Sequence, residues 1–374
     1  MVSKALHALA LPPGPRLFAA IREALSGEGP AVLLLPPGDA AATLAALRPT
    51  HLDGVRQAGG EGVPGDVAVV IATSGSTGVP KGVMLTAEAL RASARASLRR
   101  LAAVKGERWL CCLPPSHVSG LQVLVRAMLS DSEPIIHDGF DPEAVLSSGA
   151  EHVSLVPTQL HRLAERKADL SVFRTILLGG AAPRPGLLEE AEALGARIVT
   201  TYGMSETSGG CVYDGRPLYD VDLKIGGDGR IRIAGPVLFS GYRFGAAPFE
   251  DGWFVTSDLG ELNAGRLRVL GRADDVINTG GEKVVAGVVA GVLGAHPEVA
   301  DVAVIGSPDP EWGERVVAVV VPADAGRPPT LAQLRAYAKD RLPPHAAPRE
   351  LRLLASLPLL ANGKTDLAML RTGT

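Results

Sequence analysis

The chain has 374 residues, of which 46% are apolar, and can therefore bury a large core in two or three domains. Its 37 basic and 40 acidic residues leave a formal charge of -3 and form no basic run, which disfavours nucleic acid or anionic lipid as a partner. No apolar segment approaches the roughly 20 residues of a membrane span. The short apolar run near the N-terminus ends at Pro12 and Pro13 without a clear cleavage site, so we expect a cytoplasmic enzyme.

Short β-branched apolar runs recur through the first two thirds of the chain and predict strands, most of them followed by Gly or Pro. These runs are 31–37, 67–75, 108–115, 133–138, 152–157, 174–180 and 196–203. Ala-, Leu- and Arg-rich segments between them, such as 86–104 and 158–168, have the periodicity of amphipathic helices. Strands that alternate with helices predict an α/β fold with parallel sheets covered on both faces.

The pattern changes twice in the last third. From about residue 216, close-set short strands with turn signals predict a small antiparallel β subdomain. After Asp275 a helix over 284–299, a strand pair within 301–322 and a second helix over 330–342 predict a compact α+β unit. We therefore expect a large N-terminal domain over 1–273 and a small C-terminal domain over 274–374.

Three cysteines, Cys111, Cys112 and Cys211, form neither a CxxC pair nor an even set. Disulfides and a zinc cage are therefore not expected, and we interpret the three as core residues.

The stretch TSGSTGVPKG, residues 73–82, combines three glycines, four hydroxyl residues and one lysine directly after an apolar run. Glycines let backbone N–H groups approach an anion, and hydroxyls add donors without bulk, so phosphate is the expected ligand. It is not a Walker loop, because Pro80 stands five residues after Gly75 and Lys81 is followed by Gly82. The dinucleotide fingerprint G-x-G-x-x-G is absent as well.

Four further stretches place charge or glycine where a strand ends, which is where open α/β sheets bind ligands. They are TYGMSET (201–207), GWFVTSDLGEL (252–262), GRADDVINTGGEKV (271–284) and NGKTD (362–366). Glu206 suits a divalent cation held against phosphate oxygens, and Asp258 suits ribose hydroxyls. Each stretch alone is more often a turn, a helix cap or a solvated lysine. The functional inference rests on the order in which TSGSTGVPKG and these four stretches follow one another along the chain.

That order resembles the adenylate-forming superfamily, which includes acyl-CoA synthetases, adenylation domains of nonribosomal peptide synthetases and firefly luciferase. The resemblance runs from about residue 67 to 366, and TSGSTGVPKG is its most specific element. It implies three ligands: ATP, Mg2+ and coenzyme A. In such enzymes a substrate carboxylate attacks the α-phosphorus of ATP, pyrophosphate leaves, and a thiol then displaces AMP from the acyl-adenylate.

The resemblance also implies roles for individual residues. The phosphate loop comprises Thr73, Ser74, Gly75, Ser76, Thr77, Gly78 and Lys81, with Thr77 among the catalytic residues. The adenine lies against Gly179, Gly180 and Ala181 and against Tyr202, Gly203, Met204 and Ser205, the last at a position where many members have Thr. Glu206 is the Mg2+ ligand, and Asp258 and Arg272 bind the ribose.

The C-terminal part receives three further roles from the resemblance. Lys364 bridges the carboxylate and the α-phosphate, adding positive charge where negative charge accumulates. Asp274 is the hinge at which the C-terminal domain pivots between two orientations, one for each half reaction. Gly280 and Gly281 match the glycine pair that lets the pantetheine arm of CoA pass. The region before the phosphate loop is shorter than in typical members. The resemblance therefore does not decide which residues form some walls of the pocket, or whether the chain forms a homo-oligomer.

The segment LPPSHVSGLQVLVRAML, residues 113–129, should line the acyl pocket through His117, Ser119, Gln122 and Arg126, with His117 also in a catalytic role. From Ser119 to Leu129 the pattern is a helix apolar nearly all round, which predicts burial. A buried guanidinium needs an anion or hydrogen-bonding groups. Arg126 therefore meets either an internal Asp or Glu or a second carboxylate on the substrate.

A dicarboxylic substrate agrees with a narrower resemblance. The short N-terminus and SHVSGLQVLVR are similar to the o-succinylbenzoyl-CoA synthetases of bacterial menaquinone synthesis, of the compact actinobacterial type. The resemblance implies o-succinylbenzoate as the acid. The alternatives are another aryl or acyl acid–CoA ligase, a stand-alone adenylation enzyme that loads a carrier protein, and a catalytically silent nucleotide-binding homologue. Silent members tend to lose the lysine or the metal-binding glutamate, whereas this chain has both Lys364 and Glu206.

Overall fold

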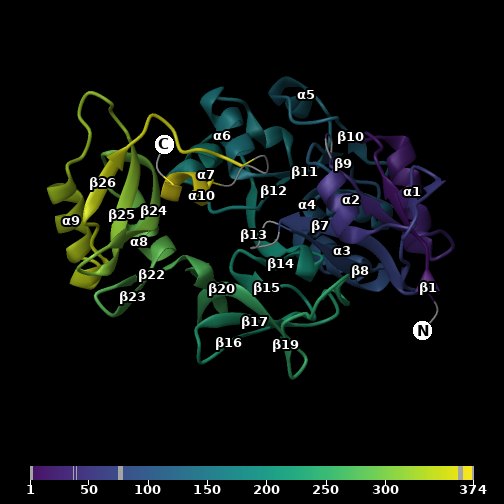
Figure 1. Ribbon diagram of the computed structural model, residues 1–374. Coiled ribbons are helices and arrows are strands. Elements are labelled where there is room, and N and C mark those ends of the chain that lie inside the picture. Colours follow the sequence, from purple (N-terminus) through teal and green to yellow (C-terminus); the bar gives the residue numbers. More distant parts are fainter. Residues whose placement is uncertain (1–2, 37, 39, 75–78, 361–364, 373–374) are drawn as a thin grey trace. The chain divides into compact units, whose positions relative to one another are not determined.

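The computed structural model describes residues 3–36, 38, 40–74, 79–360 and 365–372, and of Ser74 its backbone (Figure 1). The chain divides into two compact units, each described here by itself. Unit 1 comprises Met1–Gly180, Glu190–Leu223 and Ile233–Phe254, and unit 2 comprises Ala181–Glu189, Lys224–Arg232 and Val255–Thr374.

One seven-stranded sheet of unit 1 holds the strands on either side of the glycine-rich stretch. Its strand order is β18-β8-β7-β3-β2-β4-β5. The bounds are β2 (Leu6–Leu9), β3 (Ala31–Leu34), β4 (His51–Leu52), β5 (Val55–Arg56), β7 (Val67–Ser74), β8 (Pro80–Thr86) and β18 (Gly241–Tyr242). Strands β2, β3, β4 and β7 are parallel where they pair, whereas β8 and β18 at one end of the sheet and β5 at the other end pair antiparallel. The pair β1 (Ser3–Lys4) and β6 (Val63–Pro64) forms a separate antiparallel ribbon.

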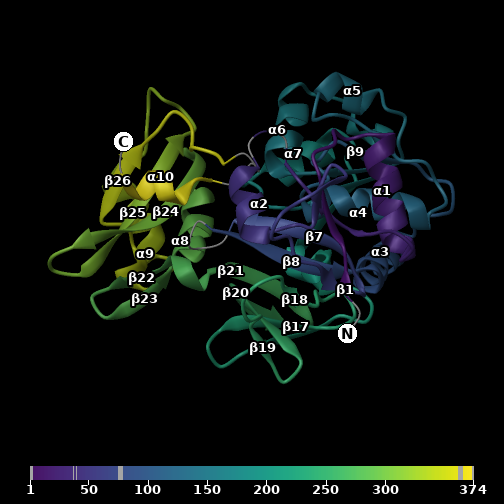
Figure 2. The same ribbon diagram turned by 45° about the vertical axis from the view of Figure 1, so that its right-hand side comes forward.

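Helices α1 (Pro15–Ser26), α2 (Ala41–Leu47) and α3 (Ala87–Leu101) cover this sheet. Helices α1 and α3 lie side by side on β7, whereas α2 packs on β8 (Figure 2). Helix α3 begins at Thr86, whose hydroxyl accepts a hydrogen bond from Ala89 N, and its basic last turn suits the negative end of the helix. Leu47 of α2 joins Leu6, Leu33 and Val70 in one buried cluster.

The second seven-stranded sheet of unit 1 has the order β10-β9-β11-β12-β13-β14-β15. Its strands are β9 (Trp109–Cys111), β10 (Ile135–Ile136), β11 (His152–Leu155), β12 (Thr175–Leu178), β13 (Ile198–Met204), β14 (Gly209–Tyr213) and β15 (Arg216–Pro217). The first five strands in this order are parallel, and β14 and β15 are antiparallel additions. Helix α4 (Val118–Leu129) packs on β9, β11 and β14 and against α3. Three strands of this sheet, β9, β11 and β14, therefore lie beside α4.

The remaining short elements connect these layers. They are α5 (Pro142–Leu146), α6 (Pro157–Glu165), α7 (Leu187–Ala193) and the 3-10 turns η1 (Leu170–Val172), η2 (Ser205–Thr207), η3 (Ala273–Asp275) and η4 (Pro344–Ala346). A five-stranded sheet has the order β16-β17-β20-β19, with β21 paired to β20. Its strands are β16 (Asp222–Ile225), β17 (Arg230–Ala234), β19 (Phe249–Glu250), β20 (Trp253–Asn263) and β21 (Arg266–Arg272). The antiparallel subdomain expected after residue 216 is thus present.

The C-terminal part of unit 2 is built on a long antiparallel hairpin. Its strands are β22 (Val276–Thr279), β23 (Glu282–Val285), β24 (Val299–Asp309), β25 (Gly313–Pro322) and β26 (Glu350–Leu353), and its helices are α8 (Ala286–Gly294), α9 (Leu331–Lys339) and α10 (Leu367–Thr372). Alternate residues of β25 face opposite sides: Val316 and Ala318 pack with α8 and α9, while Val317 and Val319 pack with Leu370 of α10. This is the predicted α+β unit.

Two expectations from composition concern the core and the membrane. All three cysteines are buried, and burial raises the pKa of each thiol to about 12. They are core residues, as predicted. Among the described residues, no helix combines the length and apolar content that crossing a bilayer requires.

Candidate active site

At the two ends of the stretch TSGSTGVPKG, Thr73 and Ser74 end β7 and Pro80 begins β8. Strands β7 and β8 pair antiparallel, so that Thr73 lies opposite Lys81, and Thr73 Oγ1 donates to Lys81 O at 3.4 Å. A Cβ on Gly82 would come within 2.9 Å of the Leu47 side chain, which explains the glycine there. The predicted loop residues Gly75, Ser76, Thr77 and Gly78, and the Ser74 side chain, lie outside the described residues. The hairpin thus positions the two sides of the predicted phosphate loop.

The turn that carries Glu206 follows directly on β13. The Thr207 hydroxyl accepts from Met204 N at 2.9 Å and donates to Gly209 O at 2.6 Å, which closes the η2 turn around Ser205 and Glu206. A Cβ on Gly203 would collide with the Gly209 carbonyl, so only glycine allows this close return of the chain.

Glu206 has an asymmetric environment. Its Oε1 accepts a hydrogen bond from the Tyr242 hydroxyl at 2.9 Å, and its Oε2 makes no hydrogen bond to a described residue. Lys81 Nζ lies 5.5 Å from the centroid of the Tyr242 ring. Burial first, and then the Glu206 charge, raise the pKa of Tyr242 well above its usual value, so that the hydroxyl remains a donor. Residues of the hairpin and of η2 therefore meet at Tyr242.

This arrangement fits Mg2+ bound together with phosphate. The described residues contain no group of three or more His, Cys, Asp or Glu side chains that could enclose a metal ion. Mg2+ typically uses only one or two carboxylates and takes its other ligands from substrate phosphates and water. One carboxylate with one uncommitted oxygen, as in Glu206, is the donor set that such binding needs.

The predicted adenine residues follow two adjacent parallel strands. Gly179 comes directly after β12, and its N–H donates to Leu155 O at 3.1 Å. A Cβ there would collide with Thr201 Oγ1 of β13, and Gly180 has a φ of +88°. The glycines thus keep the edge of the sheet open where β12 and β13 end. Tyr202 pairs with Val212 of β14, and Ala181 is the first residue of unit 2.

In unit 2 the predicted ribose and hinge residues form one charged cluster. Asp258 and Arg272 are direct partners across β20 and β21, with Arg272 Nη1 3.7 Å from Asp258 Oδ1. Arg272 Nη2 also donates to Asp274 Oδ2 at 3.0 Å. Partial burial lowers the pKa of Arg272, but the hydrogen bond to Asp274 and the charge of Asp258 raise it overall. Arg272 therefore links Asp258, the predicted ribose ligand, to Asp274, the predicted hinge.

The predicted CoA glycines form the turn between β22 and β23. Gly280 and Gly281 have φ values of +60° and +82°, which L side chains rarely adopt. A Cβ on Gly280 would lie 2.8 Å from the Trp312 ring, whereas one on Gly281 would meet no atom within 4 Å. Lys364 lies outside the described residues.

Helix α4 confirms the predicted buried helix. It runs over Val118–Leu129, and every residue from Gly120 to Ala127 is buried. His117 precedes it as an exposed cap whose N–H donates to Pro114 O, and Ser119 is exposed as well. Gln122 Nε2 donates to Leu90 O at 3.2 Å and to Ser208 O at 2.7 Å. Gln122 therefore ties α4 to α3 and to the turn that carries Glu206.

Arg126 is the buried cation of this helix, with 5% of its surface exposed. Nη2 donates to Ser154 Oγ at 3.0 Å, and the guanidinium lies 4.8 Å from the Trp109 ring centroid. Nε is buried without an acceptor, and no described Asp or Glu forms an ion pair with Arg126. Burial lowers the pKa of Arg126 below its usual value, although the nearby Tyr213 and Cys111 partly oppose this. An internal carboxylate partner is thus absent among the described residues.

Sequence reasoning missed Tyr242 and Thr207. Thr207 had a local signal, because a hydroxyl three residues after Met204 can cap the turn that follows a strand. Tyr242 lies 36 residues from Glu206, and no local pattern indicated their contact.

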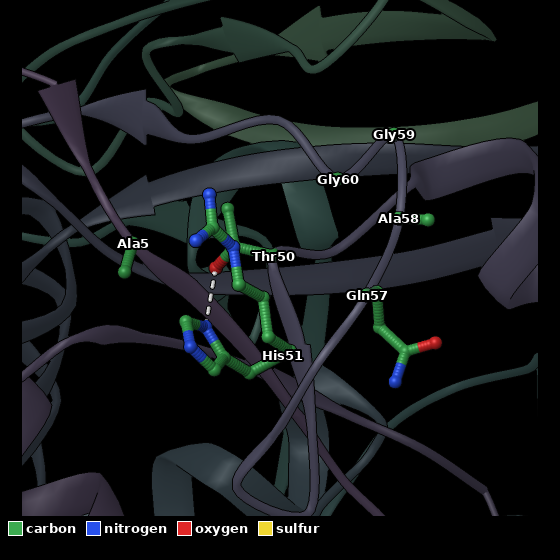
Figure 3. A pocket seen from close by; sticks show the side chains of 8 residues that line it. Ala5, Thr50, His51, Gln57, Ala58, Gly59 and Gly60 are labelled. Carbon is green, nitrogen blue, oxygen red and sulfur yellow. Dashed lines mark hydrogen bonds between the residues drawn. The ribbon is translucent and has the colours of Figure 1, made fainter.

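A hollow in unit 1 lies apart from all these residues. It has a volume of about 370 Å³ and is lined by Ala5, Thr50, His51, Arg56, Gln57, Ala58, Gly59 and Gly60 (Figure 3). The Thr50 hydroxyl is already engaged, since it donates to Leu6 O and also lies 3.0 Å from His51 Nδ1. No predicted site residue lines this hollow, so we place the candidate active site at the strand ends instead.

Comparisons with known proteins identify the family of this chain. The AMP-binding enzyme model matches residues 39–243, and the AMP-binding enzyme C-terminal domain model matches 277–364. A probable 2-succinylbenzoate–CoA ligase of Mycobacterium tuberculosis is 44% identical over 98% of this chain and 97% of its own length.

Solved structures of o-succinylbenzoate CoA synthetase from Bacillus subtilis share the fold. The complex with the acyl-adenylate intermediate is 28% identical with a TM-score of 0.84, covering all of this chain and 89% of that one. The complex with ATP and magnesium is 28% identical with a TM-score of 0.82, covering 97% of this chain and 89% of that one. These likenesses confirm the predicted α/β fold. The chain belongs to the family of AMP-binding enzymes.

Proposed function

We propose that this chain is an ATP-dependent acid–CoA ligase that converts o-succinylbenzoate to its CoA thioester in menaquinone biosynthesis. The order of its motifs, its membership of the AMP-binding enzymes and the names of its relatives support the reaction class. The single observation that supports a dicarboxylic acid is the buried Arg126 without a described carboxylate partner.

The first half reaction forms an acyl-adenylate. An oxygen of the succinyl carboxylate attacks the α-phosphorus of ATP, a new P–O bond forms, and the bond to the β-phosphate oxygen breaks to release pyrophosphate. The hairpin residues Thr73 and Lys81 flank the predicted phosphate loop, and Lys81 supplies positive charge there. Glu206 would hold Mg2+, which when bound neutralises charge on the phosphate oxygens. Lys364 would bridge the carboxylate and the α-phosphate.

The second half reaction transfers the acyl group. The sulfur of CoA attacks the acyl carbon, the bond to the phosphate oxygen breaks, and AMP leaves. We propose that residues 1–273 bind ATP and the acid, that residues 274–374 form a mobile domain hinged at Asp274, and that CoA passes Gly280 and Gly281. The positive φ values of the two glycines and the link from Arg272 to Asp274 support these roles. We also propose that the reaction takes place in the cytoplasm, where ATP and CoA are available.

A comparison with Arg243 illustrates why Arg126 supports an anionic ligand. Arg243 is half-buried, and its guanidinium donates to the carbonyls of Leu47, Arg48, Glu61 and Gly62. Those bonds occupy its donors, as expected for a structural arginine. Arg126 hydrogen-bonds only to the hydroxyls of Ser154 and Tyr213 among the described residues, and its buried Nε has no described acceptor. The guanidinium thus lies between Ser154 of β11 and Trp109 of β9, where its unused donor supports the proposal of an anionic group on the substrate.

The test compares two acids that differ by one carboxylate. Pyrophosphate release is measured with o-succinylbenzoate and with 4-oxo-4-phenylbutanoate, which lacks the ring carboxylate, in the presence and absence of CoA. We expect a strong preference for o-succinylbenzoate. Arg126→Met, which keeps an apolar stem beside Trp109, should lower kcat/KM for it by a factor that corresponds to about 2 to 5 kcal/mol. The KM for ATP should stay nearly unchanged.

The matched control is Arg91→Met, which removes a partly buried arginine of α3 that donates to Leu25 O of α1. It should preserve the preference between the two acids. Equal use of both acids by the native protein would contradict the substrate assignment. A loss of folded protein in Arg126→Met, measured by thermal unfolding, would make the arginine structural. Activation without thioester formation on free CoA would instead indicate a carrier protein as the acceptor.

A further inference from the structure

We propose that Tyr242 is a positioning residue that holds Glu206 so that one carboxylate oxygen remains directed toward the metal on ATP. This inference rests on the proposed role of Glu206 as the Mg2+ ligand. The hydroxyl of Tyr242 donates to Glu206 Oε1 at 2.9 Å, and Oε2 has no described hydrogen-bond partner. Metal ligands are commonly oriented by such hydrogen bonds from neighbouring side chains.

The same short segment holds Glu206 at two points. Phe239 N donates to the Glu206 backbone carbonyl at 2.9 Å, and three residues later Tyr242 binds the side chain. The backbone and the carboxylate are thus both attached to residues 239–242. Because a glutamate has three rotatable side-chain bonds, fixing both ends removes most of the freedom that metal binding would otherwise have to restrict.

Tyr242 is itself firmly placed. It belongs to β18 and pairs with Val83 of β8, the strand that leads out of the glycine-rich hairpin. Its ring packs edge-on against Phe239 with centroids 5.0 Å apart, and Lys81 Nζ lies 5.5 Å from the ring centroid. One aromatic ring therefore connects the hairpin of the predicted phosphate loop to the carboxylate of the predicted metal ligand.

The chemistry of a tyrosine suits this position better than that of a cation. A lysine or arginine bonded to Glu206 would neutralise the charge that attracts Mg2+, whereas a neutral hydroxyl orients the carboxylate and leaves its charge in place. A tyrosine hydroxyl is neutral at physiological pH, because its usual pKa is about 10, and it can therefore donate to Glu206 Oε1.

The test is the variant Tyr242→Phe, which removes the hydroxyl and keeps the ring between Phe239 and Lys81. Calorimetry measures the binding of ATP with Mg2+, of ATP with EDTA, and of AMP, in the absence of acid and therefore without turnover. We expect the affinity for ATP with Mg2+ to fall about 10- to 100-fold. The affinities for AMP and for ATP with EDTA should change little, and thermal unfolding should show a folded protein.

A double-mutant cycle separates orientation from packing. In Glu206→Gln the Mg2+-dependent gain in ATP affinity should disappear, and adding Tyr242→Phe should then cause little further loss. The control Tyr337→Phe removes a hydroxyl that donates to Ala295 O in unit 2, and it should leave all three affinities unchanged. If Glu206→Gln loses the Mg2+-dependent gain but Tyr242→Phe keeps it, the positioning role is overturned.

Two other outcomes are equally decisive. Equal losses for ATP with Mg2+, ATP with EDTA and AMP in Tyr242→Phe would overturn the proposal, because the hydroxyl would then support the pocket and not the metal ligand. If Glu206→Gln retains the full Mg2+-dependent gain, the metal-binding role of Glu206 fails, and the inference about Tyr242 fails with it. That result would leave the acid specificity assigned to Arg126 intact.

Discussion

Each of the two units holds one carboxylate that we predict to bind the nucleotide, but the two carboxylates have different partners. In unit 1 Glu206 is bonded to the neutral Tyr242 hydroxyl, so the carboxylate keeps its negative charge. In unit 2 Asp258 lies beside the cation of Arg272, which also binds Asp274. The first arrangement attracts a metal ion, whereas the second leaves a compensated carboxylate that suits neutral ribose hydroxyls. The partner of each carboxylate, more than the carboxylate itself, thus indicates its ligand.

The largest effect should come from removing Lys364, the predicted catalytic cation. Lys364→Ala should slow adenylate formation by about 10² to 10³, because one preorganised electrostatic contact in the transition state is lost. Thioester formation from preformed acyl-adenylate should change far less. Single-turnover measurements of both half reactions test this. Equal losses in the two would contradict a role confined to the first half reaction.

The contrast between the two carboxylates predicts different nucleotide effects. Asp258→Asn should raise the KM for ATP by about ten- to a hundredfold, since a charged hydrogen-bond acceptor is lost. Its half-saturating Mg2+ concentration should stay the same, whereas Glu206→Gln should raise that concentration. Initial rates measured over a grid of ATP and Mg2+ concentrations separate the two. The same Mg2+ shift in both variants would remove the distinction between the two regions.

Variants at the predicted hinge, Asp274, and at the predicted CoA glycine, Gly281, should impair CoA transfer alone. Asp274→Pro fixes φ near -65° and should restrict the proposed pivot, and Gly281→Leu should place a side chain in the open space beside the turn. Both variants should spare adenylation and reduce thioester formation on the order of tenfold. Pyrophosphate release and thioester yield are measured in parallel. Full thioester formation in either variant would argue against two domain orientations.

The smallest effect concerns stability around the buried face of unit 1. His152 stacks on Trp109 with centroids 4.4 Å apart, and burial lowers its pKa from 6.5, although Glu107 partly opposes this shift. Below pH 6.5 the unfolded chain takes up a proton that the folded chain does not, so stability falls with decreasing pH. The slope from this group cannot exceed about 1.4 kcal/mol per pH unit.

Urea unfolding between pH 5 and 8 measures that slope. His152→Phe, which keeps an aromatic ring against Trp109, should flatten it relative to the native chain. His161→Phe, at a half-exposed position of α6, is the control for replacing a histidine by phenylalanine. An unchanged slope in His152→Phe would show that other groups dominate the pH dependence.

Local sequence was enough to predict much of this protein. Apolar periodicity indicated the buried helix α4, and glycines in fixed order indicated the family, because close chain returns such as Gly203 against Gly209 allow no side chain. These features depend on residues close together in the chain. The N-terminal helices α1 and α2 did not emerge from the same reasoning, and they bury only part of their surface, against β3, β7 and β8.

The partners of the charged groups were decided by tertiary structure. The sequence indicated that Arg126 is buried, but left open whether an internal carboxylate meets it, and the fold places Trp109 and Ser154 there. Tyr242 reaches Glu206 only because β18 pairs with β8. Hydrogen bonds between distant residues depend on strand order and register, which apolar periodicity and local motifs do not specify. The sequence therefore determined the kinds of functional group present, and the fold determined which of them meet.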